Sequence, residues 1–272
     1  MKERTKYFIL KLMVWSCSFS AAAVLAEPTQ VTVDCGNFDE TLMQTEADAH
    51  KGIPAAQYLA AKIFLDNKCI PKDEARALEW LNKAANAGHV EAAFQLGLIH
   101  YNAAKTDDEY NKALTWFMKA KDLGDTHAYY YLGEAYLNGR GVEQDRREAE
   151  RWFSLASTRN DPRAQYQIAA LYDLGMIGRR DARKAFAWYT RAALAGYNDA
   201  HFKLGQHYMS GHGVRRDRVK AYTWYAIAGI RGHDLGLAKK NELVKTLPSD
   251  KVAEAQLLID RYLKSIESAE QQ

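Results

Sequence analysis

Apolar residues along residues 54–232 follow two alternating patterns, each typical of a helix with one buried face. In the first, as over Ala164–Tyr172, small and large apolar residues recur at i, i+4 and i+8. The second reads Ala-x-x-Trp-x-x-x-Ala. Loops separate the two patterns, so they predict pairs of helices, which we call helix A and helix B.

The helix pairs repeat at a fixed interval. Tryptophan stands at positions 80, 116, 152, 188 and 224, always 36 residues apart. Three alanine columns share this interval: Ala56, Ala92, Ala128, Ala164 and Ala200; Ala77, Ala113, Ala149, Ala185 and Ala221; and Ala84, Ala120, Ala156, Ala192 and Ala228. Such a period predicts an array of five units, at 54–89, 90–125, 126–161, 162–197 and 198–232. One long helix is excluded, because glycines interrupt most units.

The ends of helix B are also marked in the sequence. An acidic residue precedes the helix in every unit (Asp73, Glu109, Asp145, Asp181 and Asp217), and negative charge at a helix start complements its dipole. A glycine ends it in four units (Gly88, Gly124, Gly196 and Gly232). We expect the alanines to let the helices approach closely and the five indoles to fill the gap between successive units.

These motifs resemble the Sel1-like repeat, a relative of the tetratricopeptide repeat. Unit three carries the resemblance most fully, through Ala128, Tyr130, Leu132, Gly133, Tyr136, Gly139, Gly141, Val142, Asp145, Ala149, Trp152 and Ala156. The resemblance covers residues 54–232 and implies an all-α, right-handed α-solenoid. Unit two lacks the loop glycines, unit four reads Gly175-Met-Ile-Gly178, and unit one has Cys69 at a loop-glycine position.

Weaker helical segments flank the array and are expected to cap it. In the N-terminal segment, 27–53, residues Phe38–Lys51 look like a worn helix B with Gln44 in the Trp column. In the C-terminal segment, 233–272, a pair of helices is expected at Leu235–Leu247 and Val252–Ile266, the second with Ser249 or Asp250 as its N-cap.

The first 26 residues have the layout of a cleaved secretory signal. Four basic residues precede an apolar run from Leu12 to Leu25, and Val24-Leu25-Ala26 precedes Glu27, the expected mature start. A membrane anchor is the alternative, but the run is shorter than the roughly 20 residues that a spanning helix needs. We expect a periplasmic or secreted protein with no membrane span after cleavage.

Charge and cysteine content refine this picture. Cleavage would leave 33 of the 37 basic residues and 33 of the 34 acidic ones. Charges that alternate in sign along the repeats do not make the basic stripe that nucleic-acid binding needs.

Cys35 and Cys69 are the two cysteines after residue 26. In an exported chain they favour a disulfide between the cap and the first loop, worth about 3 to 4 kcal/mol; two free thiols are the alternative.

The sequence shows no recognisable reaction centre. No nucleophile elbow, phosphate-binding loop or zinc motif occurs, so we expect no catalytic residue, cofactor or metal. His201, His207, His212 and His233 are interpreted as surface histidines rather than as a metal site. The tyrosine columns (Tyr130, Tyr136, Tyr166, Tyr172 and Tyr208) are assigned to the core rather than to a ligand groove.

One strip of helix A is a candidate binding face. Counting 100° per residue, positions 25, 21, 18 and 14 before each Trp share a face that the core does not need. The candidates are His127, Tyr131, Glu134, Asn138, Gln167, Asp199, Lys203 and Gln206, on the same strip as Arg163, Ala170, Leu174 and Ser210. Because A helices commonly line the concave side of helical solenoids, a partner peptide is expected here. A merely solvated face is the alternative.

The resemblance also implies a function. Similar exported proteins are thought to act as non-enzymatic adaptors, so we expect a scaffold of the bacterial periplasm that binds another envelope protein or peptide. An alternative is an enzyme or ligand-binding protein of the cell wall, since some cysteine-rich relatives are associated with penicillin binding or β-lactam hydrolysis. Those relatives carry cysteine pairs in each repeat, unlike this chain. A secreted factor that acts on a host is a further alternative.

Overall fold

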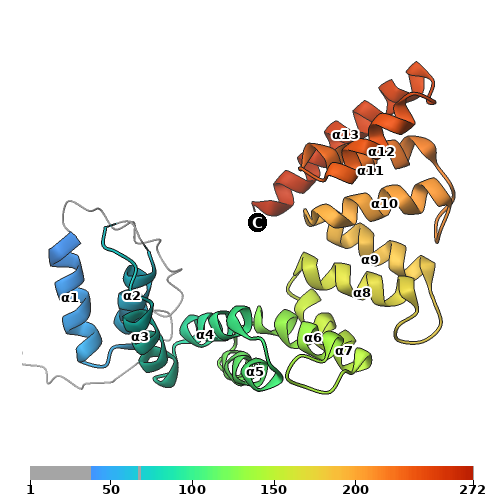
Figure 1. Ribbon diagram of the computed structural model, residues 1–272. Helices are drawn as coiled ribbons and strands as arrows, with labels where there is room; N and C mark the ends of the chain where they lie inside the picture. The colour runs from blue at the N-terminus through green and yellow to red at the C-terminus, as the bar shows by residue number, and fades with distance from the viewer. Residues whose placement is uncertain (1–37, 67–68, 272) are drawn as a thin grey trace, which may run out of the picture.

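The computed structural model describes residues 38–66 and 69–271, which form thirteen α-helices and no strand. Figure 1 shows the helices stacked in an open arc, with α1 at one end and α12 and α13 at the other. The expected all-α solenoid is therefore confirmed. The helices are α1 (Phe38–His50), α2 (Pro54–Leu65), α3 (Glu74–Asn86), α4 (Val90–Ala103), α5 (Asp107–Asp122), α6 (Ala128–Asn138), α7 (Arg146–Ser157), α8 (Pro162–Leu174), α9 (Ala182–Leu194), α10 (Asn198–Ser210), α11 (Arg218–Ile230), α12 (Asp234–Val244) and α13 (Ser249–Glu270).

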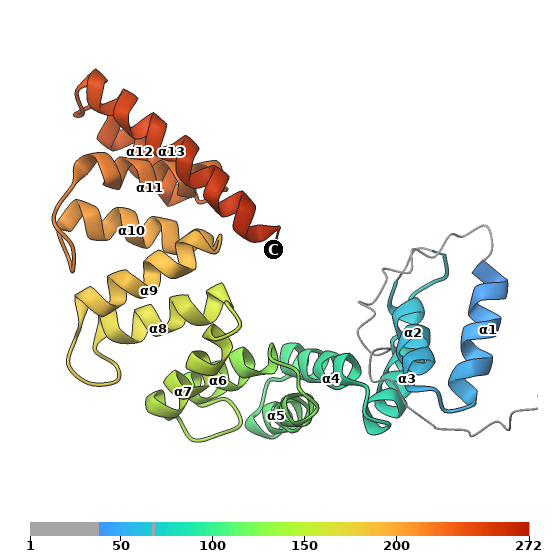
Figure 2. The same cartoon turned by 180° about the vertical axis from the view of Figure 1, so that it is seen from behind.

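The even-numbered helices from α2 to α10 are the A helices, and the odd-numbered helices from α3 to α11 are the B helices. Each A helix packs on helix B of its own unit and on the helix before it in the chain. In both cartoon views α4 lies on the inner side of the arc and α5 on the outer side (Figures 1 and 2). Because no hairpin covers its own apolar face, stacking is what completes the core.

Among the large side chains, the most deeply buried column is the residue that follows each Trp. Its members are Leu81, Phe117, Phe153, Tyr189 and Tyr225, and all are buried. In three units the ring lies flat against a glycine of helix A, where a Cβ would come within 2.6 Å of the Phe117 ring at Gly97, 2.6 Å of Phe153 at Gly133 and 2.5 Å of Tyr225 at Gly205. Units one and four have Ala61 and Ala169 at that position. Small residues of helix A therefore form the sockets for these side chains.

The tryptophans are buried less deeply than we expected. Of the five repeat tryptophans, Trp80 and Trp224 are buried, while Trp116, Trp152 and Trp188 are half-buried. Cations cover three of the indoles from the next turn of the same helix: Lys83 over Trp80 at 4.4 Å, Lys119 over Trp116 at 5.1 Å and Arg191 over Trp188 at 4.6 Å. Residues of the terminal helices cover the two buried indoles, with His50 4.9 Å from Trp80 and Tyr262 4.5 Å from Trp224. The other three indoles lie on the rim of the core.

Side chains cap the start of every B helix in the array. Asp73, Asp145, Asp181 and Asp217 each accept a hydrogen bond from a backbone N–H of the first turn. Unit two differs, because Thr106 is the N-cap and Glu109 returns a bond to the Thr106 backbone in a capping box. The acidic column marks the helix start in all units, but in unit two it lies three residues inside the cap.

The glycine column that ends helix B has a left-handed backbone, and Asn160 replaces glycine in unit three. The φ angles are +90° at Gly88, +100° at Gly124, +89° at Gly196 and +88° at Gly232, and Asn160 has φ +58°. Gly52, with φ +84°, occupies the same position after α1, as expected if α1 is a degenerate helix B.

Substituting Asn160 tests this column. Ala in a left-handed conformation costs about 1–2 kcal/mol more than Gly, so we expect Asn160→Ala to lower the free energy of unfolding and Asn160→Gly to preserve or raise it. Urea unfolding of the two variants measures the difference. Equal stability of the Ala and Gly variants would show that this turn does not hold a left-handed residue.

The terminal helices depart in detail from the expected caps. Helix α13 begins after Pro248, which caps it without a side-chain hydrogen bond, so the predicted Ser249 or Asp250 cap is wrong. The helix also extends to Glu270, packing on α11 and reaching α9. There Tyr262 lies 4.5 Å from the Trp224 ring, and Glu270 pairs with Arg231. The C-terminal cap thus covers two B helices.

Candidate functional site

The structure brings part of the predicted strip together where α6 meets α8. Gln167 of α8 donates from Nε2 to Oε1 of Glu134 on α6, at 2.6 Å. Arg163 Nη1 lies 3.5 Å from the Tyr131 hydroxyl, and its guanidinium lies 4.3 Å from the centre of the Tyr130 ring. Asp161 fixes this guanidinium with a 2.7 Å ion pair. Tyr130 also lies beside Gln167 and Glu134, so three of the predicted residues, with Arg163 and Tyr130, form one network across two repeats.

Burial changes the electrostatics of this network. Glu134 is half-buried, and burial raises the pKa of its carboxyl above the usual range. Burial and the nearby Glu134 also raise the pKa of the Tyr130 hydroxyl. The network offers amide and carboxylate oxygens and N–H donors in a partly dry setting, which suits hydrogen bonding to a peptide backbone.

Tyr131 belongs to the core as well as to the strip. Its ring stacks on that of the buried Phe117 at 4.9 Å with an interplanar angle of 13°, and it also lies 5.8 Å from Phe94 and 5.7 Å from Tyr101. The expectation that the core does not need this strip is wrong at Tyr131. The A helices are short and close together, so a large ring on their side reaches the B helix beneath.

The other predicted residues lie apart from the network. His127 is exposed, with its ring 5.8 Å from Phe94, and Asn138 donates to the Glu134 carbonyl within its own helix. In unit five, Asp199 lies 3.7 Å from His233, Lys203 is half-buried and Gln206 is exposed. Unit five therefore offers the more accessible polar part of the strip.

An aromatic column beside the strip was recognised only in part, because the sequence analysis assigned Tyr130 and Tyr166 to the core but did not include the members in the other three units. Its members, Tyr58, Phe94, Tyr130, Tyr166 and Phe202, are 36 residues apart, and the first residues of the next A helix cover their rings. His89 stacks on Tyr58 at 4.5 Å, Tyr197 lies 5.0 Å from Tyr166, and His233 stacks on Phe202 at 4.5 Å. The repeat period alone would have revealed this column, which joins one A helix to the next.

Two histidines that we interpreted as surface residues are buried. His201 is 0% exposed and its Nε2 donates to the Ala193 carbonyl at 2.9 Å. Gln57, in the same position of unit one, donates to Ala49 O at 3.1 Å. Both side chains satisfy a carbonyl at the end of the preceding B helix. His207, 3% exposed, bonds through Nδ1 to the His212 carbonyl at 2.7 Å. The helical face on which a histidine lies did not show, from the sequence alone, whether its side chain bonds to a buried carbonyl.

The described residues contain no group of three or more His, Cys, Asp or Glu that could hold a metal ion.

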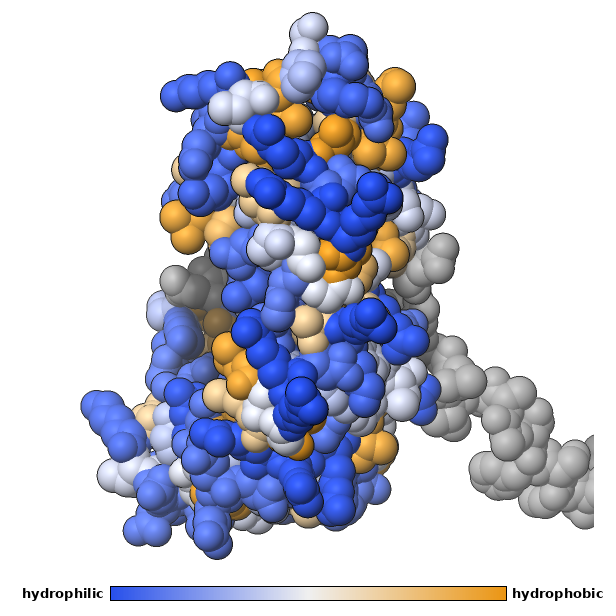
Figure 3. Space-filling model, turned by 90° about the vertical axis from the view of Figure 1, so that its right-hand side faces the viewer, coloured by the Kyte–Doolittle hydropathy of each residue, from blue (hydrophilic) through white to orange (hydrophobic). Residues whose placement is uncertain are grey.

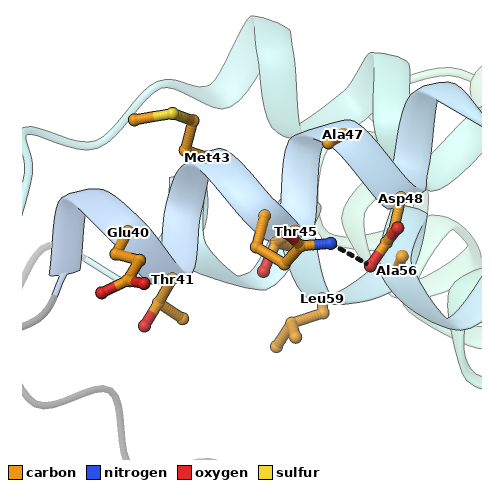
Figure 4. A pocket seen from close by; sticks show the side chains of 9 residues that line it. Glu40, Thr41, Met43, Thr45, Ala47, Asp48, Ala56 and Leu59 are labelled. Carbon is orange, nitrogen blue, oxygen red and sulfur yellow. Dashed lines mark hydrogen bonds between the residues drawn. The ribbon is translucent and has the colours of Figure 1, made fainter.

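A surface hollow of about 740 Å³ lies along α1 and α2, lined among others by Met43, Thr45 and Leu59 (Figure 4). In it Gln44 donates to Asp48 at 3.0 Å. Within residues 38–66 and 69–271, no helix is long and apolar enough to cross a bilayer.

The helix pairs, their period and their stacking agree with one known family. The Sel1 repeat model matches residues 54–89, 90–125, 126–161, 162–197 and 198–233. The chain belongs to the Sel1 repeat family. Sel1 repeat proteins are generally protein-interaction scaffolds that bind other proteins, and their fold is typically non-catalytic.

Solved structures of Sel1 repeat proteins are similar to this chain. One is c5321, a protective antigen present in uropathogenic Escherichia coli strains, with 26% identity and a TM-score of 0.74 over 86% of this chain and 50% of that one. Another is a Sel1 repeat protein from Oxalobacter formigenes, with 30% identity and a TM-score of 0.64 over 75% of this chain and 59% of that one. The chain thus spans about half to three fifths of these proteins. No curated protein matches it.

Proposed function

We propose that this Sel1 repeat protein is a non-enzymatic adaptor of the bacterial periplasm that holds another envelope protein through the strip on its A helices. The observation that carries the proposal is the network of Glu134, Gln167, Arg163 and Tyr130, which joins two repeats into one polar and aromatic surface. A surface continuous across repeats suits an extended peptide, because successive peptide residues can meet successive units.

The accessible end of the strip, in unit five, provides the test of this function. We expect Lys203→Ala combined with Gln206→Ala to abolish capture of a specific partner from an envelope extract. These side chains are half-buried and exposed, respectively, so stability should change by only about 0.5 kcal/mol. Affinity capture followed by mass spectrometry measures the effect. Tyr131 is unsuitable for this test because of its contact with Phe117.

A matched control uses exposed polar residues elsewhere. Gln256 and Lys264 are exposed on α13, and their double alanine variant should capture the partner as well as the unmodified protein. If the Lys203 and Gln206 variant still captures the partner in full, the strip is not the binding site.

The periplasmic location rests on the leader sequence and the cysteine pair. Residues 1–26 and Cys35 lie outside the described residues, so the cleavage and the bond to Cys69 stay predictions. An exported chain should begin at Glu27 and should show no thiol reactive to alkylation before reduction and two afterwards. N-terminal sequencing and mass spectrometry of the protein purified from its own cells check both. An intact leader or two reactive thiols without reduction would contradict export into an oxidising compartment.

A further inference from the structure

A strongly basic surface lies on the edge of the solenoid formed by the A–B loops of units four and five. Residues 179–184 read Arg-Arg-Asp-Ala-Arg-Lys, and residues 215–220, one repeat later, read Arg-Arg-Asp-Arg-Val-Lys. Each segment has four basic residues and one acid. We call this surface the basic edge: Arg179, Arg180, Arg183, Lys184, Arg215, Arg216, Arg218 and Lys220. The alternation of charge that we expected along all the repeats is therefore wrong here.

The two segments are neighbours in space. A Cβ on Gly213 would lie 2.0 Å from Ala182 O and 3.0 Å from Arg183 N, so the loop of unit five presses on the start of α9. Asp173 of α8 joins the loops further, because its Oδ1 lies 3.4 Å from Arg180 Nη2 and 3.2 Å from His212 Nε2. Figure 3 faces this side of the molecule, which is mostly hydrophilic with small separate apolar groups. The basic edge is thus one continuous surface.

The fold does not require these charges. Helices α3, α5 and α7 carry acidic residues in the first turn, as the helix dipole favours, whereas α9 and α11 carry none. The position of Arg179 and Arg215 is occupied by Asp107 in unit two and Glu143 in unit three. In unit three the loop therefore accepts an acid at a position where the last two units have arginine, whereas in unit two this position is the first residue of α5. Cations are unfavourable to the dipole at a helix start, so Arg183 and Arg218, in the first turns of α9 and α11, are not explained by the needs of these helices.

Most of the arginine charge is not neutralised within the protein. Arg180 pairs with Asp173, and Lys184 and Lys220 lie 3.9 Å from Asp181 and Asp217, respectively. Within the part of the chain that the structure describes, Arg179, Arg183, Arg215 and Arg216 make no ion pair, and all four are exposed. These guanidinium groups are available to an anionic partner.

We propose that the basic edge binds an Asp/Glu-rich segment of a partner protein. Six of its eight basic residues are arginine, and the planar guanidinium can hold a carboxylate through two parallel hydrogen bonds, which lysine cannot. The rows of the two units are one repeat apart, so an extended acidic segment can meet both in turn. The surface lies on the loops rather than on the A-helix strip, and so it is a second contact region beyond the proposed binding face.

The test measures binding of a fluorescent peptide of alternating Glu and Gly by anisotropy at low salt. We expect the protein to bind it and to release it as salt rises. Arg179→Glu combined with Arg215→Glu should weaken binding about tenfold or more. Its unfolding midpoint should stay the same or rise, because Glu143 occupies this position in the loop of unit three. The control, Arg261→Glu with Lys264→Glu, makes the same change in net charge at exposed positions of α13 and should bind like the unmodified protein.

Three results would overturn the proposal. The unmodified protein could fail to bind the acidic peptide, or both double variants could weaken binding equally, which would indicate net charge alone. The protein could also bind phosphatidylglycerol vesicles through Arg179 and Arg215 and not the peptide, which would make the basic edge a membrane contact. None of these results bears on capture through Lys203 and Gln206, so the two proposals fail independently.

Discussion

Replacing Phe117 by alanine is expected to lower the free energy of unfolding by about 3–5 kcal/mol. Phe117 is 0% exposed, and its ring lies against Gly97, Phe94 and Tyr131. Truncation leaves a cavity that the glycine socket cannot fill, because Gly97 has no side chain to move into it. Urea unfolding followed by circular dichroism measures the loss.

The control for this prediction is the neighbouring tryptophan. Trp116 is the larger side chain, but it is half-buried on the rim, so Trp116→Ala should cost clearly less than Phe117→Ala. A larger loss from Trp116→Ala would restore the original expectation that the indoles hold the units together, and it would refute the assignment of the deepest contact to the residue that follows Trp.

Acidification is expected to destabilise the protein through His201. Burial lowers the pKa of His201 to about 4, whereas an unfolded histidine titrates near 6.5. Between these values the unfolded chain binds a proton that the folded chain does not, so stability falls as pH drops from about 6.5 to 4. At about 1.4 kcal/mol for each pH unit, His201 accounts for a loss of about 3 kcal/mol.

The matched variant is His201→Gln. Glutamine occupies the same repeat position at Gln57, where it makes the equivalent bond to the preceding helix, so the variant should fold and keep the carbonyl satisfied. Its unfolding free energy, measured from pH 7 to pH 4, should fall by about 3 kcal/mol less than that of the unmodified protein. Burial lowers the pKa of His207 too, but that histidine is present in both proteins. Parallel pH profiles would show that His201 is not the group responsible.

The sequence was sufficient to predict the architecture, because each structural requirement of one repeat recurs in the other repeats. The alanine columns, the acids before helix B and the glycines after it each reflect a local requirement of the backbone. They form helix contacts, caps and left-handed turns, except that in unit two Thr106 replaces the acid as the cap. Even the exception at Asn160 obeys the same requirement, since asparagine tolerates a positive φ better than most residues.

The depth of individual side chains could not be predicted in the same way. Trp dominates the repeat pattern by its rarity, but three of the five repeat indoles lie on the rim, while the less uniform column of Leu81, Phe117 and Tyr189 is enclosed. His201 looked like a surface residue because its hydrogen-bond partner, the Ala193 carbonyl, is set by how the preceding helix ends. Tyr131 was assigned to the correct helix, but its contact with Phe117 depends on the distance between α5 and α6, which the repeat pattern does not give.

The binding strip is the part on which the account of function depends most. Photo-cross-linking in living cells tests it most directly, with benzoylphenylalanine placed at Gln206 on the A-helix strip or at Arg151, whose side chain is 78% exposed on helix α7. If the strip binds the partner, Gln206 should give one cross-linked envelope protein and Arg151 should give none of that species. Equal cross-linking from both positions, or cross-linking from Arg151 alone, would contradict binding through the A helices.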